Sequence, residues 1–120
     1  MKRILLALAC AGALTACSTT PKTAAQTVFA LEASYDAALD IAVTYATLPR
    51  CAPGAPPVCS DAAAVRRVNE AAHLAWAAIR AAQALARTAR PDVTALTNAR
   101  AAAELALATL TALTAPLKVS

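Results

Sequence analysis

Apolar residues recur every three or four positions along three long stretches of this chain. This spacing is typical of amphipathic helices, and it predicts helices over about residues 23–48, 61–89 and 91–114. The expected buried positions are Val28, Leu31, Tyr35, Ala38, Ala42 and Tyr45 in the first stretch, Val65, Val68, Ala72, Trp76, Ile79, Ala82 and Ala86 in the second, and Val93, Leu96, Ala99, Ala103, Leu107, Leu110 and Leu113 in the third. We expect Trp76, the single tryptophan, to fill the core at its widest point.

Proline and polar residues mark the ends of these stretches. Pro49 stops the first helix, because proline disfavours helical conformation in the residue before it. Ser60 is the expected N-cap of the second helix, with Asp61 at the positive end of its dipole. Pro91 suits the first position of the third helix, and Pro116 ends that helix.

The predicted fold is all-α, an up-down-up antiparallel three-helix bundle over residues 23–115 followed by a tail at 116–120. Short connections favour antiparallel neighbours. Alanine dominates the 59% hydrophobic content, and the chain has one Phe, one Trp and two Tyr. The core is therefore expected to be thin, which leaves association into a homo-oligomer open.

The residues before the bundle have the pattern of an export signal. Lys2 and Arg3 precede thirteen apolar or small residues, Ile4 to Ala16, which is too short for a membrane span of about twenty residues. Leu14-Thr15-Ala16-Cys17 resembles the lipobox of bacterial lipoproteins.

This resemblance covers residues 1–19 and implies a processing class, with no finer family. It implies a cleaved signal helix at 1–16, acylation of Cys17, and a tether at 17–22 that holds the protein to a membrane. Several acyl chains on one residue give firm anchoring. Ser18, rather than Asp, points to the outer membrane, facing the periplasm. The alternative is an ordinary cleaved signal followed by an incidental cysteine.

Cleavage before Cys17 changes the charge of the protein. The full chain has 11 Lys and Arg against 7 Asp and Glu. Lys2 and Arg3 leave with the signal, so the net charge falls from +4 to about +2. This small excess gives no support to nucleic acid as a partner.

Two cysteines flank the one sizeable loop of the mature chain. Cys10 is removed and Cys17 is acylated, which leaves Cys51 and Cys59. In an oxidising compartment two such thiols are expected to form a disulfide, and the alternative is a metal or redox pair. Within this loop, the residues that a partner protein would meet are Arg50, Pro53, Pro56 and Pro57.

Charged residues form rows on the outer faces of the helices. Glu32, Asp36 and Asp40 lie four residues apart, and one row of carboxylates does not converge as a metal site requires, so we expect a solvated or paired face. A mostly basic row, consisting of Arg66, Glu70, His73, Arg80 and Arg87, has three open roles: pairing with the acidic row, contact with anionic lipid, or exposure to water.

The sequence offers no support for an enzyme. His73 is the only histidine, and Glu70 three residues earlier is within its reach, but no nucleophile or phosphate-binding motif accompanies them. We therefore expect no catalytic residues, no metal and no cofactor.

Two functions remain as hypotheses. The first is a lipid-anchored structural or interaction module of the cell envelope with an unknown envelope protein as partner. Lys22, Arg87 and Arg90 would then lie near lipid headgroups. The alternative is a membrane-active or lysis accessory lipoprotein of phage or host origin.

Overall fold

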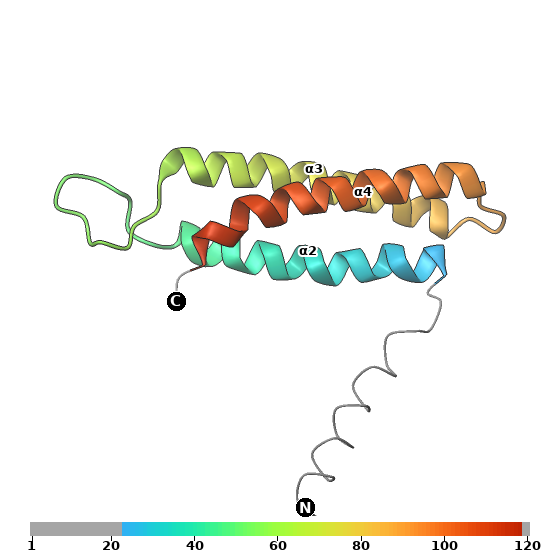
Figure 1. Ribbon diagram of the computed structural model, residues 1–120, viewed down its shortest axis with the longest axis horizontal. Helices are drawn as coiled ribbons and strands as arrows, with labels where there is room; N and C mark the ends of the chain where they lie inside the picture. Colours follow the sequence, from blue (N-terminus) through green and yellow to red (C-terminus); the bar gives the residue numbers. More distant parts are fainter. Residues whose placement is uncertain (1–22, 119–120) are drawn as a thin grey trace, which may run out of the picture.

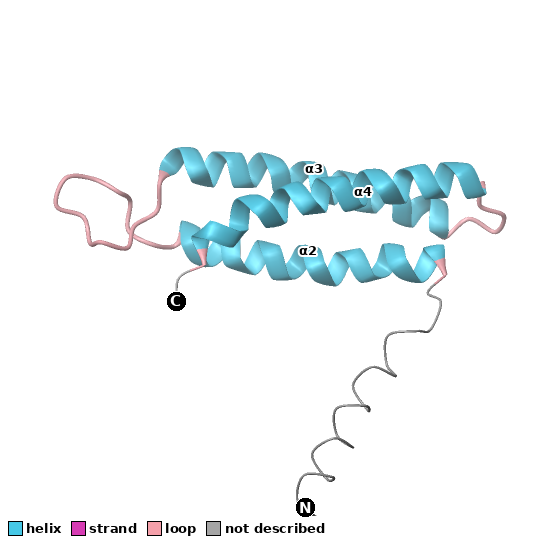
Figure 2. Ribbon diagram, in the orientation of Figure 1, coloured by secondary structure: helices cyan, strands magenta, loops and turns pink. Residues whose placement is uncertain are grey.

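The computed structural model describes residues 23–118, which fold into three long helices joined by two loops (Figures 1 and 2). α2 spans Ala24–Ala46, α3 spans Ala62–Ala86, and α4 spans Val93–Thr114. A 3-10 turn, η1, follows at Ala115–Leu117. The helices run up, down and up, so the predicted all-α three-helix bundle is confirmed (Figure 1). The lipobox, Cys17 and Lys22 lie outside the described residues.

A capping box begins α2. The Thr23 hydroxyl accepts a hydrogen bond from the Gln26 amide at 3.2 Å, and the Gln26 side-chain oxygen accepts one from the Thr23 amide at 3.0 Å. Each side chain thus satisfies a backbone amide that has no partner within the helix.

Aspartate side chains begin the other two helices. Asp61 Oδ1 accepts from the Ala64 amide, and Asp92 Oδ1 accepts from the amide three residues later, both at 2.8 Å. The predictions that Ser60 caps α3 and that Pro91 is the first residue of α4 are therefore wrong, by one residue for the cap and by two for the start of α4. Ser60 has another partner, described below, and Pro91 lies just before the cap.

Threonine hydroxyls mark the ends of α2 and α3, which stop two or three residues before the predicted positions. The Thr47 hydroxyl donates to the Thr44 carbonyl, and the Thr88 hydroxyl donates to the Leu85 carbonyl, each at 2.8 Å. These bonds satisfy carbonyls that a longer helix would have bonded. α2 therefore ends at Ala46, three residues before Pro49.

The core contains residues from all three helices. Half of its fourteen buried apolar side chains are alanines, and the largest fully buried ones are Ile79 and Leu110. The buried set is Val28, Tyr35, Ala38, Ala42, Val68, Ala71, Ala72, Ala75, Ile79, Ala82, Leu96, Ala103, Leu107 and Leu110. Small side chains let the helix axes approach closely. The contact between α3 and α4 is more extensive than the contact of α2 with either of them.

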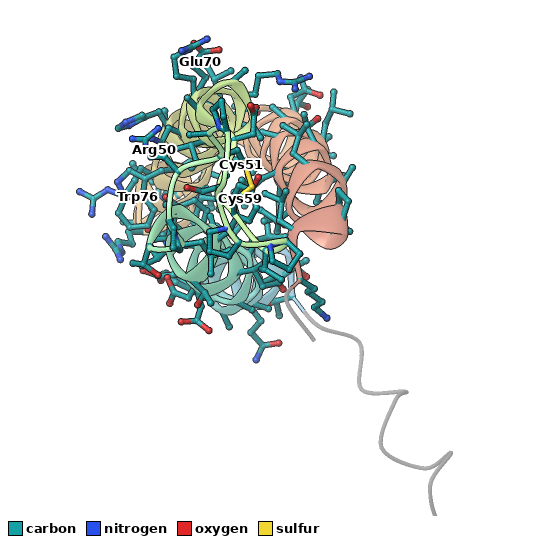
Figure 3. The ribbon with its side chains drawn as sticks, turned by 90° about the vertical axis from the view of Figure 1, so that its left-hand side faces the viewer. Arg50, Cys51, Cys59, Glu70 and Trp76 are labelled. Atoms are coloured by element: carbon teal, nitrogen blue, oxygen red, sulfur yellow. A yellow bond between two sulfur atoms is a disulfide. The ribbon has the colours of Figure 1, made fainter. Side chains whose placement is uncertain are left out.

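Several expected core residues lie elsewhere, among them Tyr45 and Val65, which are partly buried and not part of the core cluster. Val93 is 77% exposed, because it begins α4 at the end of the bundle. Trp76 is partly buried at the surface between α3 and α2, with its ring centroid 5.4 Å from that of Tyr35. It is visible at the side of the bundle in Figure 3.

The expected tail beyond residue 115 is partly wrong. Residues 115–117 continue as η1, with Pro116 within its first positions, and Leu117 packs against the core. The folded region therefore extends past Pro116.

Candidate functional site

The most distinctive surface is the loop at residues 47–61, between α2 and α3. Cys51 and Cys59 form a disulfide whose Cα atoms are 5.0 Å apart. The loop projects beyond one end of the bundle (Figure 1), and in the end-on view of Figure 3 the disulfide lies in front of the three helices. The pairing expected from the sequence is present.

Backbone hydrogen bonds close the base of the loop below the disulfide. The Ser60 amide donates to the Pro49 carbonyl at 2.8 Å, and the Cys51 amide donates to the Ser60 carbonyl at 3.1 Å. Ser60, which is 1% exposed, also donates through its hydroxyl to the Leu48 carbonyl at 3.0 Å. Ser60 therefore joins the two sides of the loop base instead of capping α3.

Tyr45 connects the loop base to the helices. Its hydroxyl oxygen accepts a hydrogen bond of 2.8 Å from the amide of Asp61, the N-cap of α3. The last turn of α2 and the N-cap of α3 are thereby held together. The loop emerges from a fixed base rather than from two independent helix ends.

The tip of the loop turns at Gly54. Its φ of 81° lies in the left-handed region that glycine adopts without strain, and the Ala55 amide donates to the Ala52 carbonyl at 2.9 Å. The candidate partner residues Arg50, Pro53, Pro56 and Pro57 are all exposed. Proline fixes φ, so this exposed surface has few conformations to lose when it is bound.

A hollow of about 400 Å³ lies between the loop and the C-terminal turn. Pro57, Val58 and Cys59 line it from the loop, and Pro116 and Lys118 line it from the other side. Residues 116–120 were expected to form a tail, so the contact of Pro116 and Lys118 with the loop was not predicted. The apolar spacing that continues to Leu113 was the one signal that α4 runs as far as the loop end of the bundle.

Cationic and apolar residues meet at the opposite end of the bundle. This end contains the start of α2 and the α3–α4 turn (Figure 1). The Arg87 guanidinium lies 5.4 Å from the centroid of the Phe29 ring, and Phe29 is 41% exposed. Arg90 and Val93 are also exposed here. The structure therefore places Arg87 and Arg90 at one end, and Lys22 falls outside the described residues.

The acidic row of α2 does not pair with the basic row of α3. Glu32 Oε2 accepts a 3.0 Å hydrogen bond from the side-chain amide of Gln83, which is 2% exposed. Between residues 23 and 118 the one ion pair joins Arg100 and Glu104 of α4, at 2.7 Å. Being partly exposed, this pair contributes little stability.

An aromatic cluster lies where α2 and α3 meet. Arg80 lies 5.5 Å from the Trp76 ring centroid, and Trp76 packs against Tyr35. Burial raises the pKa of the Tyr35 hydroxyl above its ordinary value of 10.0, and the Asp36 carboxylate raises it further. This cluster packs the bundle and offers no proton donor or acceptor near neutral pH.

His73 and Glu70, the two residues that could have formed an acid–base pair, lie on the outer face of α3. Both side chains are exposed on α3, and neither forms a hydrogen bond or ion pair with the other. Figure 3 shows Glu70 pointing outward from α3. Across residues 23–118, no three His, Cys, Asp or Glu side chains are grouped as metal ligands would be.

Comparisons with known proteins give no family. No protein-family model matches the chain, and no curated protein or solved structure matches it significantly. None of the described helices combines the length and apolar character that crossing a bilayer requires.

Proposed function

We propose that this chain is a lipid-anchored interaction module of the bacterial cell envelope, held by Cys17 in the outer membrane and facing the periplasm. Its partner, an envelope protein, binds the disulfide-closed loop. The observation that carries the proposal is the closure of this loop at three levels: the disulfide, the Ser60 hydrogen bonds, and the hydrogen bond that the amide of Asp61, the N-cap of α3, donates to the Tyr45 hydroxyl.

A loop closed in this way is suited to recognition. Ordering a flexible loop costs free energy on binding, and a loop that is already fixed avoids most of that cost. The exposed surface combines a cation, Arg50, with proline rings and the apolar side chain of Val58, which is 48% exposed. A partner with an acidic group beside an apolar surface would complement it.

The arrangement of the two ends supports the same proposal. The chain enters α2 at the end opposite the loop (Figure 1), and Thr23 is six residues from Cys17. An acylated Cys17 would keep the first end near the bilayer and leave the loop directed away from it. Arg87 and Arg90 at the first end would lie near lipid phosphates, where each basic residue gains about 1 kcal/mol.

A photocrosslinking experiment in intact bacteria tests the loop. A benzophenone amino acid replaces Val58 in the loop or Ala77, an exposed residue of α3, as the matched control. We expect a discrete crosslinked protein from position 58 and none from position 77. The Cys51→Ser/Cys59→Ser variant should lose this product while the protein stays in the membrane fraction.

A second variant separates loss of recognition from loss of folding. Arg50→Glu leaves the disulfide and the core unchanged and reverses the one charge at the start of the loop. It should weaken crosslinking from position 58 at unchanged protein level. Identical products from positions 58 and 77, or a product unaffected by both variants, would refute the loop as the binding surface.

A further inference from the structure

A groove lies on the face of the bundle between α2 and α4. It encloses about 820 Å³ and is predominantly apolar. Leu31, Ala38 and Ile41 line it from α2, and Leu107, Ala108 and Ala112 line it from α4. No loop residue lines this groove, although Lys118 lines both the groove and the hollow beside the loop. The occupant of the groove is therefore a separate question from the partner of the loop.

The direction of the two helices indicates which way an occupant runs. α2 and α4 point the same way in an up-down-up bundle (Figure 1), so their dipoles are parallel. A helix lying between them with the opposite direction would be antiparallel to both neighbours, as in four-helix bundles. The groove therefore favours an antiparallel helix.

Charged residues at the two ends of the groove suggest that this helix belongs to a second copy. Glu104, which also pairs with Arg100 of its own helix, lines the groove, and so does Lys118, fourteen residues later and just after η1. At 1.5 Å per residue this separation is about 21 Å. A two-fold axis near Thr111, the midpoint, brings the Glu104 carboxylate of each copy opposite the Lys118 ammonium of the other.

The surface of α4 beside the groove has the shape that such an interface needs. Ala108 and Ala112 present small side chains, which permit close approach of a second helix. Leu105 is 72% exposed and lies seven residues before Ala112, on the same line along the helix. It is a large apolar side chain without a neighbour to cover it in the single chain.

We propose that a second copy of this chain occupies the groove, with the α4 helices antiparallel across a two-fold axis. Each copy places the α4 ridge of Leu105, Ala108 and Ala112 in the groove of the other. The interface is isologous, so it closes with two copies and does not grow into a filament.

The pair has a consequence for anchoring that rests on the proposed function. The two amino-terminal ends lie at opposite ends of the pair. The start of α4 at Val93 is eighteen residues from Thr111, or about 27 Å, so the two ends are about 54 Å apart. Both tethers reach one bilayer when the pair lies along the membrane. Each loop then runs along the bilayer beside the other copy, instead of pointing away from the bilayer as it does in a single chain.

Cysteine crosslinking of the full chain in its native membranes tests the pairing. Thr111→Cys places a thiol near the proposed axis, and Thr109→Cys is its matched control. Both threonines are exposed on α4, and each donates its hydroxyl to the carbonyl four residues back, but Thr109 lines the α3–α4 side. A short bis-maleimide should give a dimer with Thr111→Cys at least five-fold more abundant than with Thr109→Cys.

Charge reversal tests the antiparallel arrangement. In the Thr111→Cys chain, Lys118→Glu should lower the dimer yield several-fold, because it places carboxylates opposite each other. Adding Glu104→Lys should restore the yield. A parallel pair would not recover, because the altered residues would then face their own counterparts.

The remaining outcomes overturn the proposal. Equal yields from positions 109 and 111 would mean random collision, and a Thr111→Cys product containing another protein would mean a different occupant. The chain without an added cysteine shows any product formed through Cys10 or Cys17. A failed pairing leaves the loop crosslink at Val58 unaffected, so failure of this inference and failure of the proposed function are distinguishable.

Discussion

Replacing both Cys51 and Cys59 with serine should destabilise the bundle by about 2 to 3 kcal/mol. The disulfide closes a ring of nine residues, from 51 to 59. The chain-entropy relation gives about 8.6 cal/mol/K for a ring of this size, or about 2.6 kcal/mol at 25 °C. Pro53, Pro56 and Pro57 already restrict the unfolded loop, so the measured loss should lie at or below this figure.

Thermal unfolding followed by circular dichroism measures this loss. For a domain of this size, about 2.6 kcal/mol corresponds to a fall in Tm of roughly 10–20 °C. The comparison is made in the Cys17→Ser background, which removes the predicted acylation site from both proteins. Urea unfolding of the same pair gives the change in free energy directly from the midpoint and slope.

The Ser60→Ala variant provides an independent comparison. It leaves the disulfide intact but removes the donor to the Leu48 carbonyl, which should cost about 1 kcal/mol. An unchanged Tm after loss of the disulfide would refute the view that loop closure contributes to stability. A loss above 5 kcal/mol would show that the loop is part of the core instead.

Three further predictions follow from burial and charge. Ile79→Ala should lower the free energy of unfolding by about 2–5 kcal/mol, because Ile79 is fully buried, and urea unfolding measures this. The folded-state pKa of Tyr35 lies above its unfolded value, through burial and Asp36, so the stability it contributes is complete below pH 10 and declines as pH rises through the folded pKa. Arg87→Glu/Arg90→Glu should reduce binding of unacylated protein to anionic vesicles by more than ten-fold at low salt, as measured by sedimentation.

Matched variants check each of these. Leu74→Ala, on the same helix but 69% exposed, should change stability by less than about 0.5 kcal/mol. Tyr35→Phe should flatten the decline in stability above pH 10. Arg66→Glu/Arg67→Glu makes the same charge change near the loop end and should affect vesicle binding much less. Equal effects from a variant and its control would contradict the corresponding prediction.

The sequence predicted the helices because their information is local. Apolar spacing, alanine content and proline positions all act within a few residues, and the positions predicted as buried in each helix largely face the core. The disulfide followed from counting thiols. Val93 was misplaced because spacing alone does not reveal that a helix begins beyond its neighbours.

The loop base depends on contacts that local patterns do not contain. Ser60 precedes a helix and looks like a cap, yet its hydroxyl donates to the carbonyl of Leu48, twelve residues earlier. Gln83 likewise donates a hydrogen bond to Glu32, 51 residues away, whereas the charge pattern left open whether the acidic row is paired or solvated. These hydrogen bonds join residues that come together only when the helices pack. The detailed geometry of the candidate site could therefore not be predicted from the sequence.

Mass spectrometry of the amino-terminal peptide from envelope membranes tests the central claim most directly. The account predicts a chain that begins at Cys17 and carries a diacylglycerol thioether on its sulfur. A free Cys17 thiol, or a protein recovered wholly in the soluble fraction, would contradict it.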